Sequence, residues 1–388
     1  MRYHWDKNDV RVARNKVQRL LEHETDPVQK DFYGKVIDAL DKQSFLKFNS
    51  NLQYKDRPFT NKVVDAAAAQ FGYSRFVDLI CDIQSQIAPI YDDMEEVANR
   101  EKFLLAFNPE LFETSRFTHE RTLDITRDFY NKFDKELLKY FNRIYNDRYK
   151  SIKFVPHQGV DLVNKFELCG YSFTVAGIDR VFMSVDDSKG IVKPGNTVHE
   201  FGHSIKSLIV PRKGYVTYTD FLAEVESLFP ELVFYNELGK EIDPFQSAII
   251  NYETAMSHYL DASNIIFQKL IIERWMDNDN KFDQSVYDSL KADYCMNRND
   301  IRAAINTDID DSGPYIISFA VALELYNLYK KDRDKALYLF KKIISAPHTE
   351  ESMLTLLRFK DELCGFEHLS TEYSTITQEC KKQLTRKF

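Results

Sequence analysis

The chain has 388 residues, which permits two or three domains or one large lobed body. Hydrophobic residues make up 44% of it, so a substantial core can form and an intrinsically disordered protein is excluded. With only 12 glycines and 11 prolines, the composition favours long helices over a many-stranded sandwich or barrel. The net charge of −8, with basic and acidic residues interspersed, argues against a nucleic-acid-binding protein.

The cysteines and the hydropathy pattern bear on the cellular compartment. Five cysteines are spaced far apart without a Cys-x-x-Cys pair, which is typical of reduced thiols in a cytosolic protein. The first residues are charged rather than apolar, unlike a signal peptide, and no stretch of about 18 apolar residues predicts a membrane span. We therefore expect a cytoplasmic protein without membrane or nucleic-acid partners, as a monomer or a small homo-oligomer.

Residues 1–150 predict a helical N-terminal lobe. Apolar residues recur at spacings of three and four, both from Val10 to Leu21 and from Phe129 to Ile144. Such spacing places them on one face of a helix that packs against a core. The aromatic residues of the second stretch are therefore expected in the core rather than in a ligand site.

The character of the chain changes near residue 151, where a second lobe, residues 151–388, is expected to begin. Three short segments rich in β-branched and aromatic residues predict a small β element at 151–186, and they cover residues 151–156, 166–176 and 180–185. The helical pattern then returns, with Asn196 or Thr197 as the expected helix cap. One long helix is predicted over residues 248–276.

The clearest chemical motif is HEFGH at residues 199–203, which matches the pattern HExxH. On a helix, four residues advance the chain by about 400°, so His199 and His203 project from one face, one turn apart. Two imidazoles placed in this way can bind one zinc ion. Glu200 lies next to them and can take a proton from a water that the metal activates.

A catalytic zinc site needs a third protein ligand and one open position. The metzincin pattern requires Gly and His where this chain has Lys206 and Ile209, so that class is excluded. A glutamate from a following helix is the alternative, since about 20 residues suffice for a turn and an antiparallel return. The spacing alone leaves four candidates open, namely Glu224, Glu226, Glu231 and Glu237.

The segment HEFGHS, followed by FLAEVESLFPE, resembles the thimet oligopeptidase and oligoendopeptidase F family of zinc metallopeptidases. In that family the first glutamate of the second segment is the third zinc ligand, and it aligns with Glu224. A later glutamate aligns with Glu231, two turns further on. Glu231 can accept the outer N–H of a zinc-bound histidine, and a solvated surface carboxylate is the competing interpretation.

The resemblance continues at residues 312–318, SGPYIIS. The family has a glycine-bearing loop followed by tyrosines that bind the substrate carbonyl and the oxyanion, and these features align with Gly313 and Tyr315. The position of the partner tyrosine is Ser318, and a histidine that the family has upstream has no counterpart. We expect Tyr315 on a loop that closes over the substrate, and Tyr215 and Tyr218 in the lining of the cleft.

The pattern and the resemblance together predict a mainly α fold, an elongated two-lobed helical body with a deep cleft and a small β-hairpin or sheet near the zinc helix. The implied activity is that of a zinc-dependent metalloendopeptidase, an oligopeptidase that hydrolyses short unfolded peptides. One zinc ion per chain would be bound by His199, His203 and Glu224, with Glu200 as general base and Tyr315 at the oxyanion. By analogy with the family, the strand at 180–185 would hold the peptide through its edge.

Two other functions are compatible with the sequence. One is a zinc-binding pseudo-peptidase that holds peptides or a partner without cleavage, favoured by Ser318 and by the missing histidine. The other is a helical scaffold without metal. The presence of Glu200 argues against the first, because a binding module does not need the base. Metal analysis of the purified protein decides on the second.

Overall fold

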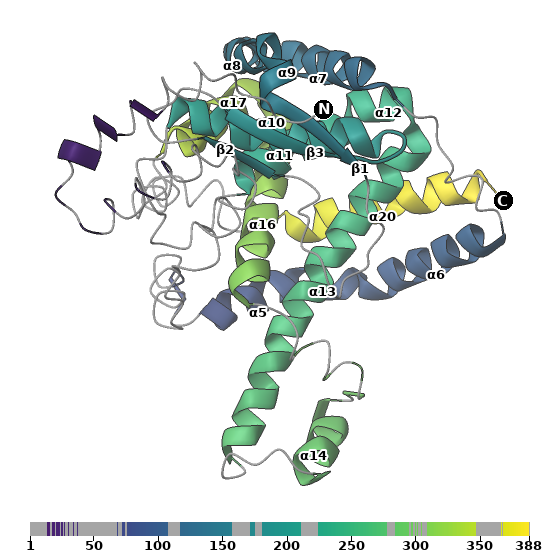
Figure 1. The fold of residues 1–388 in the computed structure, drawn as a ribbon. Helices are drawn as coiled ribbons and strands as arrows, with labels where there is room; N and C mark the ends of the chain where they lie inside the picture. The colour runs from purple at the N-terminus through teal and green to yellow at the C-terminus, as the bar shows by residue number, and fades with distance from the viewer. Residues whose placement is uncertain are drawn as a thin grey trace.

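A computed structural model of the chain describes residues 76–107, 117–156, 171–174, 181–210, 224–277, 284–294, 309–346 and 368–387, with single positions elsewhere. The described elements are mostly helices (Figure 1). Before the sheet they are α5 (Phe76–Ile87), the short 3-10 helix η1 (Ala88–Ile90), α6 (Tyr91–Phe107), α7 (His119–Phe133), α8 (Lys135–Asn146) and α9 (Arg148–Ser151). After it they are α10 (Val192–Ile209), α11 (Val225–Asn236), α12 (Leu238–Ile242), α13 (Pro244–Asp277), α14 (Gln284–Tyr294), α16 (Ile309–Lys331), α17 (Arg333–Ile344) and α20 (Leu369–Thr385).

A small sheet separates the two groups of helices. It consists of β1 (Ile152–Pro156), β2 (Tyr171–Thr174) and β3 (Val181–Asp187), in the order β1-β3-β2. Strand β3 pairs in parallel with β1 and antiparallel with β2. The strands coincide with the segments expected at 151–186, except that β3 continues to Asp187. The expectation that the 180–185 strand holds a peptide by its edge is wrong, because β3 is the central strand and pairs on both sides.

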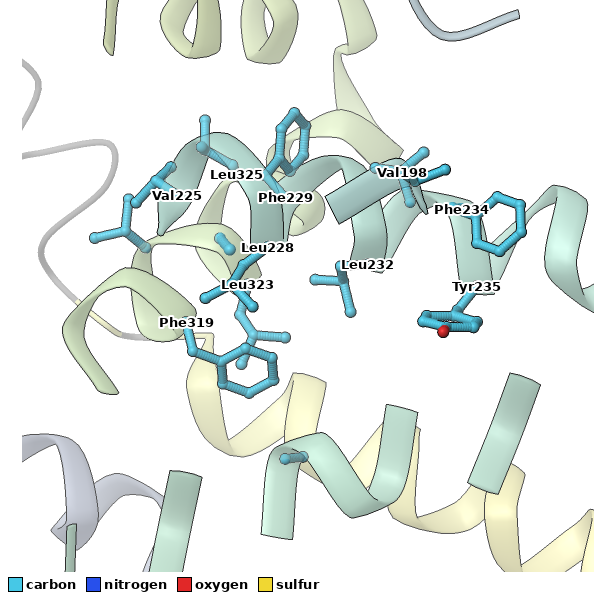
Figure 2. Packing of buried hydrophobic residues seen from close by; sticks show 14 of the residues in the cluster. Val198, Val225, Leu228, Phe229, Leu232, Phe234, Tyr235, Phe319, Leu323 and Leu325 are labelled. Carbon is cyan, nitrogen blue, oxygen red and sulfur yellow. The ribbon is translucent and has the colours of Figure 1, made fainter. Parts of the chain in front are cut away.

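Most residues of the hydrophobic core belong to helices that precede or follow the sheet in the chain. Figure 2 shows residues of α11 and α16 packed together, among them Leu228, Phe229 and Leu323, all of them buried. Phe229 also lies 5.0 Å from Phe340 of α17 and 5.7 Å from Phe133 of α7, measured between ring centroids. The aromatic residues around 129–141 are thus core residues, as the spacing predicted.

Helix α7 contacts the helix that carries the HExxH motif. The Tyr130 hydroxyl donates a hydrogen bond of 3.1 Å to the carbonyl oxygen of Val198, the residue before His199. Tyr130 is fully buried and packs its ring against Phe201, with 6.3 Å between centroids. Helices on both sides of the expected boundary at 150/151 therefore contribute to one hydrophobic core, whereas α14 packs with the end of α13 in a separate cluster. The two-lobed outline and the deep cleft remain predictions.

Two local expectations are corrected and one is confirmed. Helix α10 begins at Val192, after Ile191 and without a side-chain cap, so neither Asn196 nor Thr197 caps it. The Thr197 hydroxyl instead donates to the carbonyl oxygen of Lys193, 2.7 Å away, inside the helix. The long helix expected over 248–276 is confirmed as α13, which spans residues 244–277.

Candidate metal centre

Three side chains that can bind a metal meet between α10 and α11. His199 and His203 lie one turn apart on α10, and Glu224 is the residue directly before α11. Glu224 Oε2 lies 3.4 Å from His199 Nε2 and 3.2 Å from His203 Nε2. Ligand atoms of the three residues lie within 4.8 Å of one another, and no other such group occurs among the described residues. This His-His-Glu group can hold a metal ion.

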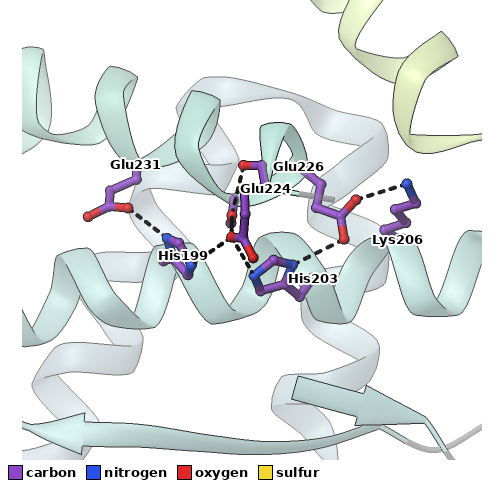
Figure 3. A network of polar contacts seen from close by, with 7 residues as sticks. His199, His203, Lys206, Glu224, Glu226 and Glu231 are labelled. Atoms are coloured by element: carbon purple, nitrogen blue, oxygen red, sulfur yellow. Dashed lines mark hydrogen bonds and ion pairs between the residues drawn. The ribbon is translucent and has the colours of Figure 1, made fainter. Parts of the chain in front are cut away.

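The outer nitrogen of each imidazole contacts a second carboxylate of α11 (Figure 3). His199 Nδ1 lies 2.7 Å from Glu231 Oε2, and His203 Nδ1 lies 3.1 Å from Glu226 Oε1. A carboxylate only accepts hydrogen bonds, so each Nδ1 carries the proton that is shared. This arrangement directs both Nε2 atoms toward Glu224.

Close packing of α10 against α11 makes these contacts possible. A Cβ added at Gly202 would overlap the carbonyl oxygen of Glu226 and lie 2.8 Å from Ser227 Cα. Pro230 has no N–H, so it cannot donate to the Glu226 carbonyl four residues earlier, and that carbonyl faces Gly202 instead. Pro230 lies inside α11, and the helix runs through it without a break.

The carboxylates and imidazoles of the site stabilise each other's charged forms. Burial disfavours the charged form of Glu224, but the two imidazoles outweigh burial and lower the pKa of this carboxyl well below its usual range. Burial likewise lowers the pKa of His203, but Glu224 and Glu226 raise it to about 10. In the absence of a metal, these pKa shifts favour protonated imidazoles beside an ionised Glu224.

Glu200 lies on α10 between the two histidines and is buried, with 5% of its surface exposed. Burial raises the pKa of its carboxyl to about 7, against the opposing effect of the nearby imidazoles. Its Oε2 atom has no hydrogen-bond partner within the described part of the chain. A buried carboxylate oxygen without a partner, next to a possible metal site, is suited to hold a water or a substrate atom.

The residues expected at the substrate are only partly described. Tyr315 is 40% exposed and lies within α16, so the expectation that it rides on a loop is wrong. Gly313 lies in the same helix and is buried. Ser318, one turn further on, is fully buried. Tyr215 and Tyr218 lie outside the described residues.

His258 of α13 was not expected near the site. Its ring lies parallel to that of Tyr315 at an interplanar angle of 18°, with 6.5 Å between centroids. Its Nδ1 atom is buried and has no hydrogen-bond partner among the described residues. Burial lowers the pKa of the ring to about 4, with Glu224 acting in the opposite direction. No sequence motif marks this histidine, because α13 is brought to α16 only by tertiary packing.

The structure also shows where the other candidates for the third ligand lie, namely Glu226, Glu231 and Glu237. Glu226 and Glu231 contact the outer nitrogens and are not in the ligand group. Glu237, at the end of α11, lines a cavity of about 410 Å³ with Lys132 and Glu241, and no residue of the His-His-Glu group borders that cavity. Spacing alone missed the contact between Glu226 and His203, because it gives no information on where α11 begins.

Comparisons with known proteins place the fold. No protein-family model and no curated protein matches the sequence. A candidate oligoendopeptidase F from Bacillus anthracis str. Ames aligns in structure with a TM-score of 0.51 at 11% identity, over 99% of this chain and 76% of that one. A candidate peptidase from Chlamydophila abortus aligns with a TM-score of 0.54 at 14% identity, over 97% and 63%.

A third solved structure, PZ peptidase A with an inhibitor, aligns with a TM-score of 0.51 at 12% identity, over 95% of this chain and 71% of that one. The chain therefore has the fold of the oligoendopeptidase F structures, which supports the family resemblance seen in its sequence.

Among the described residues, no helix combines the length and the apolar character that crossing a bilayer requires.

Proposed function

We propose that the protein is a zinc-dependent endopeptidase of the oligoendopeptidase F type, which hydrolyses short unfolded peptides. The observation that carries the proposal is the His-His-Glu group with the buried Glu200 beside it. Two imidazoles and one carboxylate form the donor set of catalytic zinc sites that keep an open position for water or substrate. His199, His203 and Glu224 would bind one zinc ion per chain.

With zinc held by these three residues, the site would supply Lewis acidity and a lowered pKa of bound water. Glu200 is the general base: its carboxylate takes the proton of the attacking water and passes a proton to the leaving amine. Its raised pKa, about 7, suits it to both roles near neutral pH. Tyr315 donates a hydrogen bond to the carbonyl oxygen of the substrate as that oxygen gains charge.

The substrates are proposed from the fold and the resemblance. The neighbours named as peptidases share the fold, and Tyr315 is exposed on the helix that packs against α11. We propose a cytoplasmic enzyme without nucleic-acid or membrane partners. The binding-only alternative gains no support from the site, because the motif retains its base and a pseudo-peptidase has no use for it.

The test combines metal analysis with a digest of a peptide library. The purified protein is expected to contain close to one zinc per chain and to cleave short peptides, with product masses showing internal cuts. Glu200→Gln is the control, because it preserves the shape of the site and removes the base. Zinc without cleavage in the parent would favour the binding-only alternative, and a protein without zinc would refute the proposal.

A further inference from the structure

His199 and His203 differ in the surroundings of the carboxylate that contacts the Nδ1 atom of each ring. Glu231, on His199, has a side chain that is 15% exposed. Glu226, on His203, is 4% exposed, and its second oxygen, Oε2, forms an ion pair of 2.9 Å with the Nζ atom of Lys206. Figure 3 shows the resulting chain of contacts from Lys206 through Glu226 to His203.

Lys206 is fully buried, although it lies less than one turn beyond His203 on α10. Burial of a charged lysine is strongly unfavourable unless a carboxylate compensates its charge. The same cost applies to Glu226, so each group makes the burial of the other tolerable. The two buried groups therefore hold each other in place behind the half-buried His203.

We propose that Glu226 is a positioning residue for the metal ligand His203, and that Lys206 balances its charge and holds its carboxylate in place. This inference rests on the proposed function. A carboxylate behind a metal-binding imidazole fixes its tautomer and ring orientation, and losing such a partner typically lowers metal affinity 10–100-fold. The pair thus serves the metal rather than the stability of the helix packing alone.

The obvious variant, Glu226→Gln, removes the carboxylate and so takes its ion-pair partner Glu226 from the buried Lys206 ammonium. It is expected to lower the melting temperature, so it does not separate a structural role from a positioning role. The double variant Lys206→Met with Glu226→Leu replaces the pair by apolar side chains of similar volume, a change that is often neutral for stability. It nevertheless leaves His203 Nδ1 without its acceptor.

The experiment measures zinc affinity by competition with a chelator and the melting temperature of the metal-free protein, in the full chain. For the double variant we expect a melting temperature near that of the parent and a zinc affinity about 10–100-fold lower. The variant Lys206→Met with Glu226→Gln retains an acceptor oxygen without the charge, so its affinity is expected to lie between the two. Glu231→Leu provides the matched loss at His199.

A second readout follows the metal directly. In cobalt-substituted protein, the visible absorption bands report the ligand geometry, and they are expected to shift in the double variant. A double variant that folds, binds zinc within about twofold of the parent and shows unchanged cobalt bands would overturn the inference. In that case the parent would still bind zinc and cleave peptides, whereas failure of the proposed function would appear in the parent itself.

Discussion

Gly202 of α10 lies against the backbone of Glu226 in α11, so closely that a Cβ on the glycine would overlap the Glu226 carbonyl oxygen. The motif HEFGH therefore contains a packing residue as well as chemical groups. The absence of a side chain at Gly202 lets α11 approach the helix that carries both histidines. Through this approach Glu224, Glu226 and Glu231 all reach imidazole nitrogens.

Gly202→Ala is expected to lower the free energy of unfolding by about 1–3 kcal/mol, because the methyl group meets backbone atoms that cannot rotate away. Zinc affinity should fall with it, since separating the helices moves Glu224 away from the imidazoles. Denaturant unfolding and metal content measure the two effects. The matched control is Gly34→Ala, where an added Cβ meets no atom of the described residues within 4 Å and stability should not fall. Equal effects at both glycines would contradict the packing argument.

The ligand set predicts an order of metal affinities. His203→Ala and Glu224→Ala should each lose zinc, because two protein ligands rarely hold it against a chelator. Glu237→Ala is the control, since Glu237 lies outside the His-His-Glu group and should leave the zinc content unchanged. Metal analysis after dialysis against a chelator gives the result. Full zinc occupancy in Glu224→Ala would show that the third ligand is another residue.

Removal of the base should separate binding from catalysis. In Glu200→Gln we expect unchanged zinc content and a fall in peptide turnover of about 10²–10⁴-fold. The amide occupies nearly the same volume, so the buried position of the side chain is preserved. Steady-state kinetics on one cleaved peptide, together with metal analysis, provide the measurement. Turnover equal to that of the parent would exclude Glu200 as the base.

Zinc affinity is expected to rise with pH. Without metal, the pKa of His203 is about 10, because Glu224 and Glu226 outweigh the effect of burial, so zinc must displace a proton below that pH. The folded pKa exceeds the unfolded value of about 6.5, so this proton stabilises the metal-free protein most below about pH 6.5. That stabilisation is lost as the pH rises toward 10. Dissociation constants at several pH values test this, and a constant that does not change with pH would refute it.

Tyr315→Phe should lower kcat and kcat/KM together by about 10²–10³-fold and leave KM nearly constant. The reason is that the hydroxyl interacts most strongly when the carbonyl oxygen of the substrate has gained charge. Tyr338→Phe is the matched control, because Tyr338 is also exposed but lies on α17. A Tyr315→Phe enzyme within about twofold of the parent would remove this residue from the mechanism.

The sequence by itself determined the helical character, the position of the β element and the pairing of His199 with His203. These follow from local periodicity, since a spacing of four residues on a helix places two side chains on one face whatever the rest of the chain does. The long helix α13 was predictable for the same reason. The fold of the oligoendopeptidase F structures likewise agrees with a resemblance that short motifs carried.

Only the tertiary structure decided which glutamate joins the His-His-Glu group and which ones contact the outer nitrogens of the histidines. Glu224, Glu226 and Glu231 are equivalent in chemistry, and their roles depend on where α11 begins and how closely it approaches Gly202. The same holds for the burial of Lys206 and for the position of His258 beside Tyr315. Such contacts join residues that are distant in sequence, and their geometry is set by the packing of whole helices, for which local periodicity contains no information.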